Sequence, residues 1–173
     1  CFFIFPTNFS AVCVKTTNLD PIAVTVIMVA LDVVAALVGV VFGGMMRLFR
    51  LSVKYFAPIF FLLGYLCFAT SPSLPSLLAG CLFIGIANGI GVPYLNTIAS
   101  IKAGQDAATT VMPLLSAALY AGQFLSPLVA TPLAAKFFPD NLSGIYWIAC
   151  AFSVLFLLEA FATRRFQSLP PKE

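Results

Sequence analysis

The sequence places one carboxylate inside a long apolar segment. Asp32 lies near the middle of residues 22–43, which are otherwise rich in Val and Ala. A carboxylate at the centre of a membrane-spanning helix costs about 2.5–3.5 kcal/mol on insertion scales, so such a group usually faces protein or water rather than lipid. Asp32 is therefore a candidate for proton coupling or solute contact. The alternative is a structural acid that is hydrogen-bonded to a neighbouring helix.

Other polar side chains also interrupt the apolar segments, either near mid-span or close to one edge. They are Asn88, Gln123, Tyr120, Thr7 and Asn8. Amides both donate and accept hydrogen bonds, which suits them to bind a polar solute. Together with Asp32, these residues form the predicted solute path. For each of them the alternative is hydrogen bonding between packed helices.

The residue content argues against several other chemistries. The chain has no His, which removes His metal ligands and His general bases, and its five Cys are scattered without a CxxC pair. It has no phosphate-binding loop and no basic run with interleaved aromatics of the kind that binds nucleic acid. We therefore expect no enzymatic activity, no metal, no cofactor and no nucleic-acid partner.

Composition indicates an all-α, polytopic membrane bundle. Of the 173 residues, 61% are hydrophobic and 9% are charged, whereas soluble domains carry about 25% charged residues. A helix needs about 20 mostly apolar residues to cross a bilayer. About six helices are predicted, at 1–14, 22–43, 55–70, 74–101, 109–134 and 145–163. The connections are short, among them a predicted polar turn at 102–108, so residues 1–173 form one transmembrane domain. Residues 1–14 resemble the end of a helix whose start is missing, and we expect a fragment of a longer protein.

The segment 74–101 combines an apolar run with several glycines and a proline. Gly85 and Gly89 are four residues apart, a spacing that lets another helix backbone approach closely. Pro93 removes one backbone N–H and favours a bend. These features predict a kinked, inward-facing helix that carries Asn88 near mid-membrane.

The basic residues indicate an orientation. Seven of the nine Lys and Arg residues fall in one set of alternate loops, and only Lys15 and Lys136 fall in the other. Basic loops face the cytoplasm, so the C-terminus is predicted to be cytoplasmic. Residues 43–50 and Lys54 form a predicted short basic loop. Its Arg47 and Arg50 are first of all orientation signals and secondly a candidate gating latch.

Several stretches resemble the C-terminal half of a major facilitator superfamily transporter, spans seven to twelve with the seventh truncated. Residues 43–50, Gly-Gly-Met-Met-Arg-Leu-Phe-Arg, resemble the family's loop between spans eight and nine, with Met46 and Phe49 where the strong motif has Asp and Gly. Residues 85–89, Gly-Ile-Ala-Asn-Gly, followed by Pro93, resemble the tenth span. Residues 121–127, Ala-Gly-Gln-Phe-Leu-Ser-Pro, resemble the eleventh.

The resemblance implies two six-helix halves around a central cavity, with alternating access and with 1–14 and 74–101 lining the path. It implies secondary active transport of a small solute, as a symporter or antiporter, and proton coupling is the expected mode. The expected partners are the lipid bilayer, the missing N-terminal half, a small-molecule substrate and protons, and the expected location is the bacterial cytoplasmic membrane. The alternative is a non-transporting membrane scaffold or a subunit of a membrane complex.

Overall fold

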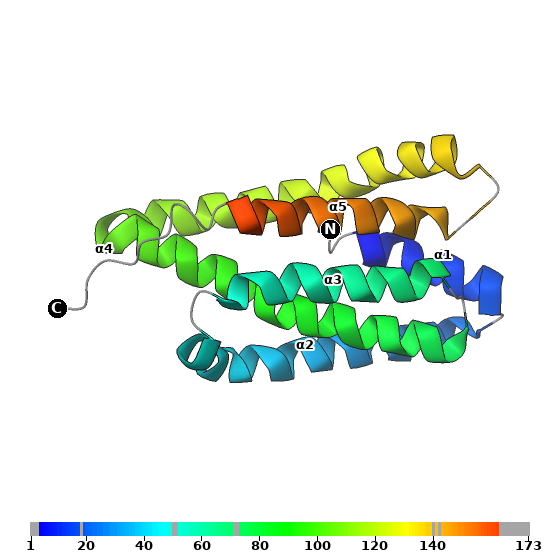
Figure 1. Ribbon diagram of the computed structural model, residues 1–173, viewed down its shortest axis with the longest axis horizontal. Helices are drawn as coiled ribbons and strands as arrows, with labels where there is room; N and C mark the ends of the chain where they lie inside the picture. Colours follow the sequence, from blue (N-terminus) through cyan, green and yellow to red (C-terminus); the bar gives the residue numbers. More distant parts are fainter. Residues whose placement is uncertain are drawn as a thin grey trace.

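Long helices make up nearly all of the described chain (Figure 1). The computed structural model describes residues 4–17, 19–49, 52–70, 73–139, 141 and 143–162. No strand occurs within these ranges, and the helices in chain order are α1 Ile4–Thr17, α2 Pro21–Phe49, α3 Val53–Thr70, α4 Leu74–Phe137 and α5 Gly144–Ala162. The prediction of an all-α chain is confirmed.

Helix α4 consists of two legs that meet at Gly104. This residue has φ 70° and ψ 176°, and glycine reaches positive φ without the steric cost that a Cβ would add. The chain turns back on itself at this point, so the second leg returns along the bundle (Figure 1). The first leg is Leu74–Gly104 and the second is Thr109–Phe137. Residues 102–108, predicted as a polar turn, are therefore helical on both sides of a single break.

Several segments are long and apolar enough to cross a membrane, which indicates an integral membrane protein. They are Pro21–Phe49, Val53–Thr70, Leu74–Gly104, Thr109–Phe137 and Gly144–Ala162. A shorter apolar helix, Ile4–Val14, precedes them. The prediction of transmembrane helices is thus supported in length and composition.

The prediction that residues 43–50 form a loop is wrong for most of their length. Helix α2 continues through Gly43 and Gly44 to Phe49, which puts Arg47 in its last turn. Met45 and Met46 are half-buried against the core, and this packing offsets the cost of about 1 kcal/mol that each glycine adds to a helix. Lys54, also assigned to that loop, lies instead in the first turn of α3 and is only 8% exposed.

Glycines bring α4 against α2. A Cβ built on Gly85 would lie 2.9 Å from the Leu31 carbonyl oxygen, and one built on Gly89 would collide with the Ala35 carbonyl oxygen. The two backbones therefore approach as closely as they do only because these positions lack side chains. This confirms that Gly85 and Gly89 admit another helix, and it identifies that helix as α2.

A cluster of aromatic rings joins α1, α3 and α5. The Phe68 ring on α3 lies 5.5 Å from Phe5 on α1 and 5.1 Å from Tyr146 on α5, measured between ring centroids. Phe9 and Tyr65 extend the cluster. All five side chains are at most 1% exposed. The cluster therefore packs α1, α3 and α5 against one another through fully buried rings.

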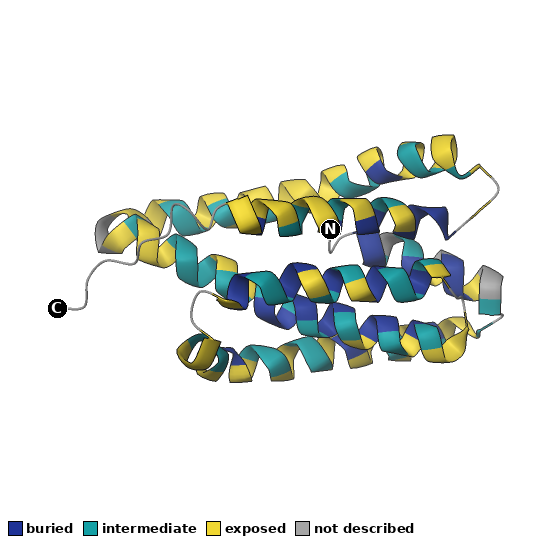
Figure 2. Cartoon of the chain, in the orientation of Figure 1, coloured by how far each residue is buried: buried dark blue, intermediate teal, exposed yellow. Residues whose placement is uncertain are grey.

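Burial differs sharply between the helices (Figure 2). In the most apolar windows of α3 and of the first leg of α4, 44% of the residues are buried. The corresponding share is 11% in α2 and 6% in the second leg of α4. We call these two segments the outer helices. Figure 1 shows them on opposite edges of the bundle, and most of their side chains are open to whatever surrounds the chain.

Candidate functional site

Helix α2 has one exposed face on which polar and small residues lie together with one large apolar residue, Val29, which is 57% exposed. This face carries Thr25, Asp32, Ala36 and Gly43, all exposed, and we call it the α2 stripe. The spacings of seven, four and seven residues keep these positions on one side of a helix with 3.6 residues per turn. Asp32 lies near the middle of the 29-residue helix. The stripe therefore places a carboxylate at mid-span on an open face.

The remaining exposed surface of α2 is strongly apolar. Val33, Leu37 and Val40 are 53%, 63% and 84% exposed. The opposite side of the helix is buried through Leu31, which packs on α4. Helix α2 thus has one face against the bundle, one face suited to lipid tails, and the α2 stripe between them. A lipid-facing helix has no need of a separate polar face.

The exposed surface of the second leg of α4 is likewise divided into a polar face and an apolar face. Ser116, Tyr120, Gln123 and Thr131 are all exposed and share one side of the helix, and we call this set the α4 stripe. The successive spacings are four, three and eight residues, which is close to whole helical turns. Leu114, Leu125 and Leu128 form the exposed apolar face, at 63%, 53% and 57% exposed. Two of the predicted path residues, Tyr120 and Gln123, therefore belong to one polar surface.

One further predicted residue lies beside the α4 stripe. Asn8 on α1 and Thr131 on the second leg line the same cavity, which has a volume of about 300 Å³. The Asn8 side-chain amide donates a hydrogen bond to the Ile4 carbonyl oxygen, over 3.0 Å. The cavity also includes Asn141, at the end of the bundle where α5 begins.

The other predicted site residues are more dispersed. Asn88 is half-buried on the first leg of α4, next to Gly89, and it does not lie on either outer helix. Arg47 is exposed in the last turn of α2. The Thr7 side chain and the whole of Arg50 lie outside the described residues.

Sequence reasoning missed three polar residues of the two stripes, Thr25, Ser116 and Thr131. Their spacing in the sequence could have identified them, because each lies close to a whole number of helical turns from Asp32 or from Gln123. What the sequence did not show is that these faces are open while α3 and the first leg of α4 are enclosed. Thr25 donates its hydroxyl to the Pro21 carbonyl oxygen at 2.9 Å, so its oxygen remains available as an acceptor.

Comparison of the chain with protein-family models, with curated proteins and with solved structures gives no match. The candidate function therefore rests on the two stripes, on Asp32 and on the membrane-spanning character of the helices.

Proposed function

We propose that this chain is the C-terminal half of a secondary active transporter of the major facilitator type. In this proposal it moves a small solute by alternating access, and Asp32 carries the coupling proton. The observation that carries the proposal is the exposed Asp32 in the middle of a membrane-length helix, on a face that it shares with Thr25, Ala36 and Gly43.

The energetic argument concerns what covers the α2 stripe. A carboxylate against hydrocarbon costs about 2.5–3.5 kcal/mol, and lipid can offer no compensating hydrogen bond. The face with Asp32 therefore meets protein, water or solute. The α4 stripe must likewise meet protein, water or solute at Gln123, because an unpaired amide is also costly in an apolar medium.

A second half of the transporter supplies the natural partner for both surfaces. Solute sites in such folds lie near the midplane, between the halves, and Asp32 and Gln123 are both near mid-span. The basic residues Arg47, Lys54 and Lys102 lie at one end of the bundle, which we call the basic end. By the distribution of Lys and Arg, the basic end is the cytoplasmic side of a bacterial inner membrane.

Substitution of Asp32 tests the proposal. The complete transporter, reconstituted in liposomes, is screened with a panel of small solutes while a pH-sensitive dye reports proton movement. Asp32→Asn keeps the shape of the side chain but cannot exchange a proton, so solute-driven proton movement is lost while exchange of solute at equal concentrations persists. Asp20→Asn is the matched control: Asp20 accepts a hydrogen bond from the Ile22 N–H at 3.0 Å at the start of α2, and Asn caps a helix equally well.

Two results would argue against this function. Gradient-driven uptake that is unchanged in Asp32→Asn would make Asp32 a structural acid. If the protein is a scaffold or a subunit of a membrane complex, no solute in the panel gives saturable flux, although Asp32→Leu still lowers stability by leaving a neighbouring polar group unpaired.

A further inference from the structure

The Asp32 carboxylate has no counter-charge within the described part of the chain. It lies exposed near the middle of α2, and the described residues offer it neither a hydrogen bond nor an ion pair. Arg47, the basic residue of the same helix, follows fifteen residues later, which is about 22 Å along the helix axis. A counter-charge for Asp32, or a proton in its place, therefore comes from outside these residues.

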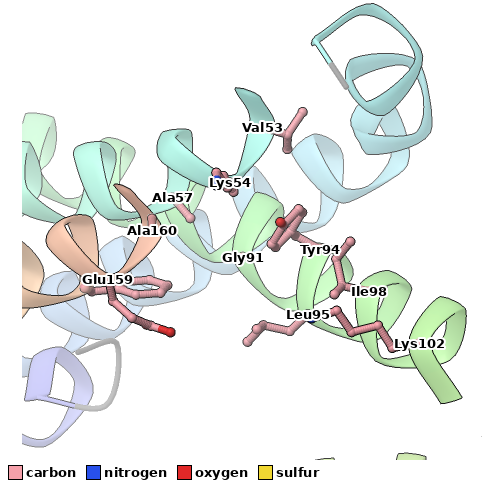
Figure 3. A pocket seen from close by; sticks show the side chains of 11 residues that line it. Val53, Lys54, Ala57, Gly91, Tyr94, Leu95, Ile98, Lys102, Glu159 and Ala160 are labelled. Carbon is pink, nitrogen blue, oxygen red and sulfur yellow. The ribbon is translucent and has the colours of Figure 1, made fainter. Parts of the chain in front are cut away.

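The elements packed against α2 bring no described positive charge to the level of Asp32. These elements are α1, α3 and the first leg of α4. Lys54 and Lys102 lie at the basic end, where they line a cavity together with Glu159 (Figure 3). The other titratable side chains described on these elements are thiols and phenols, which never carry a positive charge: Cys13, Tyr55, Tyr65, Cys67, Cys81 and Tyr94. A solute anion would therefore meet repulsion from Asp32 and no balancing cation on these helices.

Two other classes of solute fit the α2 stripe poorly. A hard metal ion takes about six to eight oxygen ligands, and the described residues contain no group of three or more His, Cys, Asp or Glu that could hold one. Each hydroxyl of a sugar needs a partner when it leaves water, yet the stripe offers only Asp32 and Thr25, whose hydroxyl already donates to Pro21. The stripe therefore suits a solute with one positive charge and few hydrogen-bonding groups.

Apolar side chains flank Asp32 on the same face of α2. Val29 lies three residues before Asp32 and Ala36 lies four residues after it, and both are exposed. These spacings place one of them on each side of the carboxylate along the helix, about one turn away. Alkyl groups bound next to the charge would cover both side chains and remove apolar surface from water. A carboxylate with such neighbours matches an ammonium ion that carries alkyl groups.

We propose that the solute is an organic cation, a tertiary or quaternary ammonium ion with apolar substituents, whose charge is balanced by Asp32. This inference rests on the proposed transport function, and it adds the class of solute and the direction of coupling. A carboxylate that holds a proton is neutral and no longer attracts the cation, so Asp32 binds either the proton or the solute. Alternation between the two makes the protein an antiporter that releases one proton for each cation bound.

Equilibrium exchange of radiolabelled tetraethylammonium tests this in the complete transporter, reconstituted in liposomes. This ion has a permanent charge and no exchangeable proton, so proton movement that depends on it passes through the protein. The wild type should exchange it saturably. Asp32→Asn should lose the coupled proton movement and need about tenfold more tetraethylammonium for half-maximal exchange, because the attraction between opposite charges is lost. Asp32→Glu should retain both properties, and Asp20→Asn, at the start of α2, should match the wild type.

A second variant tests the apolar contacts while Asp32 stays in place. The wild type should reach half-maximal exchange at an about tenfold lower concentration of tetraethylammonium than of tetramethylammonium, because the added methylenes meet apolar side chains. Val29→Thr keeps the shape of the side chain and adds a hydroxyl, so this preference should fall to about threefold, with tetramethylammonium unaffected. A preference that is unchanged in Val29→Thr overturns the placement of the solute beside Asp32.

The same measurements separate the class of solute from the transport function itself. If a neutral or anionic solute shows saturable proton-coupled flux that Asp32→Asn removes, and tetraethylammonium is not exchanged, the transport function stands and the cation is wrong. An unchanged half-maximal concentration of tetraethylammonium in Asp32→Asn also overturns the ion pair with Asp32 and leaves transport in place. If the wild type exchanges no solute at all, both proposals are overturned.

Discussion

Gly89→Ala tests the contact on which the position of α2 depends. The added Cβ would collide with the Ala35 carbonyl oxygen and would lie 2.8 Å from the Val38 Cβ and 3.1 Å from the Ala35 carbonyl carbon. Because the obstacle is backbone, no rotamer change relieves it, and α2 has to move away from α4. Overpacking of this kind costs about 1–3 kcal/mol, while alanine recovers up to about 1 kcal/mol of helix propensity.

The expected net loss is therefore about 1–2 kcal/mol, or a fall of roughly 2–8 °C in the unfolding temperature for a chain of this size. Thermal unfolding of the purified protein in detergent measures it. Gly122→Ala is the matched control, because Gly122 lies in the same long helix and a Cβ there meets nothing within 4 Å. If Gly89→Ala is as stable as Gly122→Ala, the close approach of α2 and α4 is wrong.

Two further predictions concern orientation and the core. Cysteines placed one at a time at positions 102 and 136, on a background without native cysteines, should be labelled from outside intact cells at 136 and not at 102; the reverse pattern contradicts a cytoplasmic basic end. Phe68→Ala should lower the free energy of unfolding by about 3–5 kcal/mol, because its ring contacts α1 and α5. Leu63→Ala on the outer side of α3, where the side chain is 39% exposed, should change it much less, and equal losses would contradict the aromatic core.

Much of the fold follows from local features of the sequence. The apolar runs predict the helices, because length and composition decide whether a segment can span a membrane. The spacing of Gly85 and Gly89 predicts a close helix contact. The spacing does not reveal which helix makes this contact, because that depends on how α2 packs in the folded bundle.

The parts that sequence reasoning missed depend on tertiary packing. Lys54 reads as a loop residue beside Arg47, and its burial arises only when α3 packs with α4 and α5. Residues 43–49 contain two glycines, yet they remain helical because Met45 and Met46 reach the core. Asp32 could be singled out from the sequence, whereas the openness of its face became visible only with the burial of the neighbouring helices.

The most direct test of the central claim is water access to the α2 stripe. Single cysteines replace Ala36, on the stripe, and Leu37, on the adjacent apolar face, in the complete protein without its native cysteines. The cysteine thiolate, which forms in water and not in hydrocarbon, attacks a charged thiol-specific reagent. A water-lined path predicts that the cysteine at 36 is modified and that the cysteine at 37, next to it in the chain, is not. Modification of 37 alone, or of neither position, would contradict a solute path along this face of α2.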